Sequence, residues 1–197
     1  GNKLLVPYLD GRANQRVAVL NTITNTVLET LDFGSDTPTF LINDTGDMAV
    51  ITGDNGVEYG YAEYDLTTLQ KKSEENFSLK RFFSPGPLNA DLIDGVLYYL
   101  NFYAQPALVP FGPAVYDFQK MESKVIDMIA IVQEVQNELQ TNITLTSLGY
   151  EEIGGVFIVG YSKEENTVLE GGVLIISADG DLLRNITLPF APTYVVR

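Results

Sequence analysis

Two short patterns recur along this chain of 197 residues, and they constrain its fold more than any other feature. The first pattern is an apolar segment, a polar turn and a second extended segment. Its four copies are anchored at Asn21, Asp65, Asp117 and Ser177, with spacings of 44, 52 and 60 residues. An Asn or Asp side chain can accept a hydrogen bond from the backbone two residues later, so the first three anchors are expected to close tight turns. The turn after Ser177 is of a different kind.

The second pattern precedes every copy of the first except the copy at Asn21. It consists of a strand, a turn that contains Gly and a strongly apolar strand, and it covers residues 39–51, 90–100 and 145–159. Gly adopts the positive φ that tight hairpin turns require. The continuous apolar runs in the second strands are typical of strands that are buried on both faces. Together the two patterns indicate repeating units of four short strands.

The spacing of the anchors predicts the architecture. One four-stranded blade of a β-propeller takes roughly 40–50 residues, so each interval holds one blade plus loop insertions. We therefore predict an all-β chain with at least twelve strands, folded as a single β-propeller domain over residues 1–197 with about four blade-equivalents. Residues 191–197 match residues 37–43 position by position. Pairing of Thr193–Val196 with Leu4–Tyr8 would close the ring, and the alternative is an arc of a larger propeller.

A family resemblance rests on these same segments. Pro-Thr-aromatic strands at 38–40 and 192–194 alternate with Val-Ala-Val-Leu-Asn-Thr-Ile-Thr-Asn-Thr-Val at 17–27. This combination resembles the surface-layer or YncE-type β-propeller repeats of bacterial cell-envelope proteins, over most of the chain. The resemblance implies an exported, lipoprotein-like bacterial protein of the periplasm or cell surface, with a ligand or partner bound on one loop face. It carries over no functional residue to a position in this sequence.

The composition excludes several classes of chemistry. The chain has no Cys and no His, which excludes disulfides, thiolate metal sites and Ser-His or Cys-His catalysis. Its 12 basic and 26 acidic residues give a net charge of −14, and such a surface repels nucleic acid and anionic lipid. No apolar run is long enough for a membrane-spanning segment. Phosphate loops and zinc motifs are absent, so we expect neither a cofactor nor a metal.

Residues 121–140 carry two conflicting signals. Five apolar residues recur with the helical spacing of 3, 4, 3 and 4: Val125, Met128, Val132, Val135 and Leu139. A four-stranded unit, however, needs its last strand near residues 124–131. We predict a strand to about Ile131 and a short helical insertion near 132–140, whose apolar stripe packs on the flank of the propeller.

Candidate binding residues lie on the loops that link second to third strands, at 9–16, 53–58, 101–112 and 161–170. Binding residues concentrate on loops that a rigid scaffold positions, and the segment 101–112 is unusually rich in aromatic residues and Pro. That segment either forms a recognition surface or caps the core. The predicted ligand-binding residues are Tyr103, Phe111, Arg12 and Asp54.

Two functions remain open from the sequence. The first is a non-enzymatic module that binds a protein or glycan partner. The alternative is a carbohydrate-active hydrolase or lyase that uses paired acids. The acids available on the predicted loops are Asp10, Asp36, Asp54 and Glu164. The acidic stretches 44–47 and 54–56 contain oxygen ligands suited to calcium, but they match no defined calcium loop and are more simply turns.

Overall fold

The computed structural model describes residues 2–34, 38–43, 45–53, 58–78, 88–103, 107–165 and 168–193. These residues form fifteen strands and one helix, which confirms the all-β prediction and the predicted minimum of twelve strands. The strands are β1 (Lys3–Leu9), β2 (Gln15–Asn21), β3 (Thr26–Asp32), β4 (Thr39–Ile42), β5 (Met48–Gly53), β6 (Glu58–Tyr64), β7 (Lys71–Ser78), β8 (Leu88–Ile93), β9 (Val96–Phe102), β10 (Phe111–Asp117), β11 (Glu122–Val125), β12 (Ile143–Glu151), β13 (Val156–Glu165), β14 (Val168–Ser177) and β15 (Leu182–Leu188).

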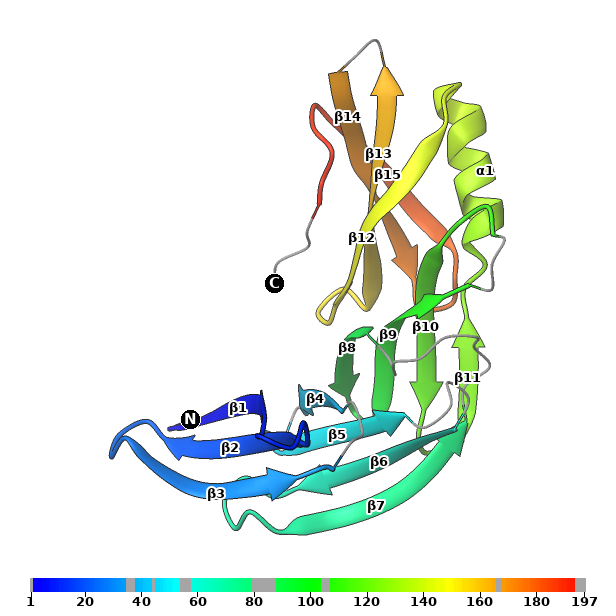
Figure 1. Ribbon diagram of the computed structural model, residues 1–197. Helices are drawn as coiled ribbons and strands as arrows, with labels where there is room; N and C mark the ends of the chain where they lie inside the picture. Colours follow the sequence, from blue (N-terminus) through cyan, green and yellow to red (C-terminus); the bar gives the residue numbers. More distant parts are fainter. Residues whose placement is uncertain are drawn as a thin grey trace. The chain divides into compact units, whose positions relative to one another are not determined.

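The strands make four sheets, and in each sheet every strand pairs with its neighbour in sequence. The first sheet has three strands, in the order β1-β2-β3. The other three have four strands each: β4-β5-β6-β7, β8-β9-β10-β11 and β12-β13-β14-β15 (Figure 1). Every pairing is antiparallel. Both recurring patterns are therefore confirmed as hairpins: the first forms the last two strands of each sheet, and the second forms the first two strands of each four-stranded sheet.

The predicted turn chemistry is present at each anchor. Three anchors use Oδ1 to accept hydrogen bonds from the N–H groups two and three residues later: Asn21 at 2.9 and 3.2 Å, Asp65 at 2.6 and 2.9 Å, and Asp117 at 3.0 and 3.0 Å. The fourth turn differs, because Ser177 Oγ accepts from the Asp181 N–H at 3.0 Å. Each turn also contains one residue with positive φ: Asn25, Leu69, Met121 and Gly180. The anchors thus set where each hairpin reverses.

The chain divides into two compact units, which are described separately. The first unit holds the sheets β1–β3 and β4–β7, and the second holds the sheets β8–β11 and β12–β15. That both units belong to a single domain stays a prediction. The core of the first unit contains Val17, Met48 and Val50. As expected for a middle strand, the consecutive residues 48–51 of β5 are all at most 2% exposed.

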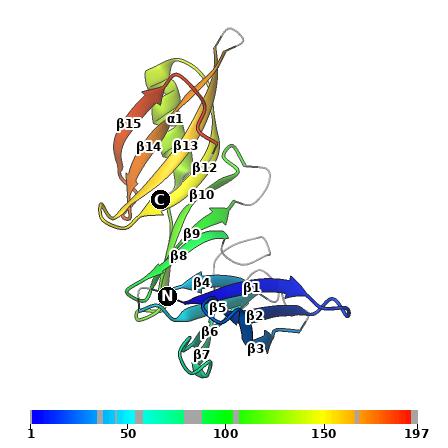
Figure 2. The ribbon, with the colours of Figure 1, turned by 90° about the vertical axis from the view of Figure 1, so that its left-hand side faces the viewer.

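The core of the second unit is larger and includes the helix α1 (Met128–Leu139). Met128, Ile131, Val132 and Val135 are its buried residues. They pack with one face of the β12–β15 sheet, in a cluster that includes Phe157, Val159, Tyr161, Leu174 and Ile176 (Figure 2). No helix in the described ranges is long and apolar enough to cross a membrane.

The helix begins earlier than the sequence pattern predicts. β11 ends at Val125 instead of near Ile131, and α1 begins at Met128 instead of Val132. The Asp127 side chain fixes this start, because it accepts a hydrogen bond from the Ile129 N–H at 2.9 Å. The apolar spacing could not locate the boundary, since Val125 keeps the helical period although it lies in a strand.

The end of the described chain crosses the other face of the β12–β15 sheet. Thr146 Oγ1 donates a hydrogen bond to the carbonyl oxygen of Pro192. A side chain at Gly160 or Gly171 would collide with neighbouring atoms, and Pro192 is among the nearest contacts at both positions. The predicted pairing with β1 involves residues 193–196, of which 194–196 lie outside the described residues, so ring closure stays a prediction.

Candidate functional site

A cavity of about 290 Å³ lies in the second unit, between the loop 107–110, the helix α1 and the beginning of β12. Figure 1 shows α1 and β12 side by side at this place. The residues that line the cavity are Leu108, Val109, Pro110, Val132, Gln136, Asn142, Ile143, Thr144 and Leu145. Three separate segments of the chain therefore contribute to one hollow.

The floor of the cavity is aliphatic and its rim is polar but uncharged. Val109, Val132, Ile143 and Leu145 are at most 8% exposed and form the floor. Leu108, by contrast, is 64% exposed at the rim, where the uncharged polar groups are Gln136, Asn142 and Thr144. None of the lining residues carries an ionisable side chain. The site can bury an apolar group and offer amide and hydroxyl hydrogen bonds around it.

Tyr103 holds two walls of this cavity together without lining it. Its backbone N–H donates to the Pro110 carbonyl at 3.1 Å and closes the base of the loop. Its hydroxyl donates to the Ile126 carbonyl at 2.5 Å and accepts from the Met128 N–H at 3.4 Å. Burial raises the pKa of Tyr103 to about 12. This predicted binding residue therefore connects the loop to the start of α1.

Phe111 lies at the other end of the same loop. It is the first residue of β10, it pairs with Phe102 in register, and the two rings meet edge to face with centroids 6.4 Å apart. Its ring packs against the core of the second unit. The loop residues that reach the cavity are instead Leu108, Val109 and Pro110. Their signal in the sequence is an apolar Leu-Val-Pro run inside a loop, where polar residues are the rule.

The other predicted site residues lie elsewhere. Arg12 is exposed in the turn between β1 and β2, in the first unit. Its N–H donates to Asp10 Oδ1 at 2.7 Å, and this hydrogen bond is the main reason why the pKa of the Asp10 carboxyl is lowered. Asp10 also forms an ion pair with Arg16, at 2.9 Å between Oδ2 and Nε. Asp54 lies outside the described residues.

Of the four acids proposed for catalysis, Asp10 is the one whose side chain the structure describes, so a paired-acid site stays untested. Asp10 is engaged in its own turn, while Asp36 and the side chain of Glu164 lie outside the described part of the structure. Within that described part, no three Asp or Glu side chains gather closely enough to hold a metal ion.

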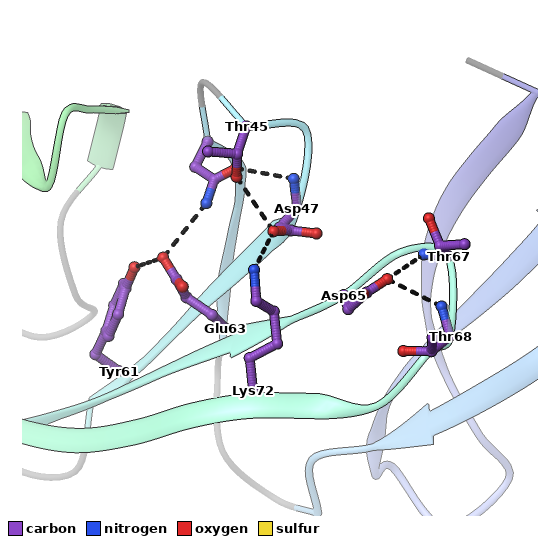
Figure 3. A network of polar contacts seen from close by, with 9 residues as sticks. Thr45, Asp47, Tyr61, Glu63, Asp65, Thr67, Thr68 and Lys72 are labelled. Carbon is purple, nitrogen blue, oxygen red and sulfur yellow. Dashed lines mark hydrogen bonds and ion pairs between the residues drawn. The ribbon is translucent and has the colours of Figure 1, made fainter.

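Thr45 and Asp47 of the acidic stretch 44–47 are part of a polar network in the first unit, and residue 44 lies outside the described residues (Figure 3). Asp47 Oδ2 accepts from Lys72 Nζ at 2.6 Å and from the Thr45 hydroxyl at 3.1 Å. The hydrogen bond from Lys72 is the main cause that lowers the pKa of Asp47. The Asp47 N–H donates to Asn43 Oδ1 at 2.8 Å, so this stretch closes a turn. Of the second stretch, 54–56, every residue lies outside the described ones.

Comparison with known proteins finds similar folds among solved structures. No protein-family model matches the sequence, and no curated protein matches it. The β-propeller domain of Myceliophteria thermophila Cps50 (Swd1) matches with a TM-score of 0.58 and 16% identity, over 98% of this chain and 55% of that chain. The Dos1 propeller matches with a TM-score of 0.52 and 13% identity, over 95% of this chain and 44% of that chain.

This chain has a β-propeller fold. Its sheets are the blades, three of them with the four strands that the sequence patterns predict. The chain spans about half the length of the two propellers that it matches. At these levels of identity the likeness concerns the fold alone, and the site must be interpreted from its own residues.

Proposed function

We propose that this β-propeller chain is a non-enzymatic binding module that holds an uncharged group of a partner molecule in the cavity between the loop 107–110, α1 and β12. The observation that supports this proposal is that the residues lining the cavity are aliphatic or polar and uncharged. General acid–base or nucleophilic catalysis needs a titratable or nucleophilic group at the reacting atoms. The lining supplies an aliphatic floor and neutral hydrogen-bonding groups instead, which suit recognition.

The proposal extends to where the protein works. The likeness of its repeats to bacterial envelope propellers supports an exported protein of the periplasm or cell surface. The net charge of −14 supports a protein or glycan partner rather than nucleic acid. Fractionation of the native host with an antibody against this chain tests the location, and recovery in the cytoplasm alone would overturn it.

Mapping by nuclear magnetic resonance tests the site directly. The isotopically labelled protein is titrated with N-acetyl-leucine amide, N-acetylglucosamine and adenosine monophosphate. We expect a neutral probe to shift the amide signals of residues 108, 109 and 142–145, and we expect the nucleotide to leave them unchanged. Absence of any shift at these residues with every probe would overturn the proposal. Release of reducing sugar from polysaccharides by the purified protein would favour the hydrolase or lyase instead.

A matched pair of variants gives the control. Gln136 lines the cavity, whereas Gln133 is exposed on the same helix and does not. Gln136→Arg should place a long charged side chain at the rim and remove the probe-induced shifts, while Gln133→Arg should preserve them. If the probe-induced shifts were the same in both variants, the probe would bind outside this cavity.

A further inference from the structure

We infer that the partner is a short extended peptide with aliphatic side chains, which pairs as an additional strand with the free edge of β12. This inference rests on the proposed function, because it names the chemistry of the ligand for the same cavity. Three observations carry it: the position of β12 in its sheet, the composition of the cavity floor and the distribution of charge.

The first observation concerns the edge of the sheet. β12 is the terminal strand in the order β12-β13-β14-β15, so within the described residues β13 is its one strand partner. Four consecutive residues, 142–145, line the cavity. Asn142 precedes β12, and Ile143, Thr144 and Leu145 are its first three residues. Because successive side chains of a strand point to opposite faces, three consecutive strand residues that border one space indicate that this space lies along the backbone edge of the strand. The cavity therefore adjoins the edge of β12 with which no other strand pairs in the described ranges, and such an edge is what strand addition uses.

The second observation concerns the size and chemistry of the floor. Small-molecule sites have volumes of roughly 300–1,000 Å³, and this cavity lies at the lower end with about 290 Å³. It suits one or two side chains better than a nucleotide or a large cofactor. Val109, Val132, Ile143 and Leu145 offer only aliphatic surface, so a Leu or Val side chain would be buried there without loss of hydrogen bonds.

The third observation concerns charge. The rim groups of Gln136, Asn142 and Thr144 can bond to peptide N–H and C=O groups without introducing charge. The chain as a whole carries a net charge of −14, which repels acidic peptides and attracts basic ones during encounter. No aromatic side chain lines the cavity, so a sugar ring would find no ring face on which to stack. These features favour an aliphatic peptide with basic flanking residues.

The experiment uses a fluorescent peptide, acetyl-Lys-Val-Leu-Val-Lys-amide, and measures its anisotropy with the full chain. Two versions of this peptide carry N-methyl groups on alternate residues, one version on the odd set and the other on the even set. In an antiparallel pairing only alternate N–H groups point towards the neighbouring strand. We expect one methylated version to bind at least about tenfold more weakly than the parent and the other to bind like the parent.

Two controls separate the inference from the proposed function. Equal binding of both methylated peptides would overturn strand pairing, and the proposed binding site would stand if N-acetyl-leucine amide still shifts the amide signals of residues 108, 109 and 142–145. Failure of the parent peptide and of N-acetyl-leucine amide together would overturn both. Gln136→Arg should abolish peptide binding and Gln133→Arg should preserve it. A peptide with Glu in place of both Lys residues should bind more weakly, and tighter binding of that peptide would contradict the role assigned to charge.

Discussion

At the scale of single residues, hydrogen bonds to backbone atoms connect segments that are far apart in the sequence. Tyr103 bonds to backbone groups at Pro110, Ile126 and Met128, and so it joins a loop to a helix that begins 25 residues later. A ligand-binding role of Tyr103 stays a prediction, and these contacts mean that its replacement should also affect folding stability.

Tyr103→Phe removes the hydroxyl and leaves the Ile126 carbonyl and the Met128 N–H without this partner. We expect the free energy of unfolding to fall by about 1 kcal/mol or more in urea denaturation. Tyr8→Phe, at a more exposed position in β1, should stay within about 0.5 kcal/mol of the parent. An unchanged urea midpoint for Tyr103→Phe would contradict the clamp between loop and helix.

The same tyrosine predicts a pH dependence. Its pKa of about 12 in the folded chain lies above the ordinary value of 10.0, so the folded state keeps the proton more tightly than the unfolded state. The stability from this group is complete below about pH 10 and is lost as the pH rises through about 12. Burial also raises the pKa of Tyr150 and Tyr161. The signal of Tyr103 is therefore isolated by subtracting the tyrosinate absorbance of Tyr103→Phe from that of the parent during a pH titration. The difference should show one group that titrates near pH 12, and a group that titrates near pH 10 would refute the assignment.

Residue 171 must be Gly because backbone atoms of other segments lie close to the position that a Cβ atom would occupy. A Cβ atom there would collide with the Tyr161 carbonyl oxygen and lie 3.1 Å from the Ala191 Cα. Because these are backbone atoms, Gly171→Ala should lower the free energy of unfolding by about 1–3 kcal/mol. Gly11 has no atom within 4 Å of its Cβ position, so Gly11→Ala should be neutral or slightly stabilising in the same urea experiment. If Gly171→Ala and Gly11→Ala lowered the free energy of unfolding by similar amounts, the collision at residue 171 would not be the cause of the destabilisation.

At the scale of elements, one turn chemistry is used repeatedly. Asn21, Asp65 and Asp117 each accept two backbone hydrogen bonds, and each is followed four residues later by a residue with positive φ. These contacts are local, so the final hairpin of a sheet can form before the rest of its sheet is complete. For this reason the turns could be predicted from the sequence alone.

Asp65 provides the test of this turn. Backbone hydrogen bonds from Thr68 and Thr67 lower its pKa, so its contribution to stability is present above about pH 4 and is lost as the pH falls through the folded-state pKa. Asp65→Ala should lower the urea midpoint at pH 7, and Asp65→Asn, which keeps the accepting oxygen, should lower it less. The difference between the parent and Asp65→Asn should shrink at about pH 2.5. A difference that is independent of pH would contradict this account.

At the scale of the whole molecule, the sequence predicts sheets better than sites. The anchors and the apolar middle strands locate the hairpins because each signal acts over a few residues. The cavity depends on residues 108–110, 132, 136 and 142–145, which meet only in the folded second unit. The four-strand repeat assigns residues 128–131 to a strand against their helical spacing, although the Asp127 cap begins the helix there. The meeting of these segments has no local signal, which is why Tyr103 and Phe111 could be singled out but Ile143 and Thr144 could not.

The net charge of −14 predicts how stability responds to salt. Like charges repel in the compact state, and the screening length falls from about 30 Å at 0.01 M salt to about 10 Å at 0.1 M. The melting temperature should therefore rise by a few degrees between these two concentrations of sodium chloride. Potassium chloride should act in the same way, because the effect depends on ionic strength. A melting temperature that falls or stays constant would show that self-repulsion is not significant.

Every sheet in this molecule is built from one uninterrupted stretch of chain, with each strand paired to its neighbours in sequence. A gene duplication or deletion that spans such a stretch would add or remove a whole sheet and leave the strand pairings of the others unchanged. The architecture therefore lets the chain change its length in steps of about 50 residues, so related proteins would be expected to differ in the number of sheets more readily than in the construction of any one of them.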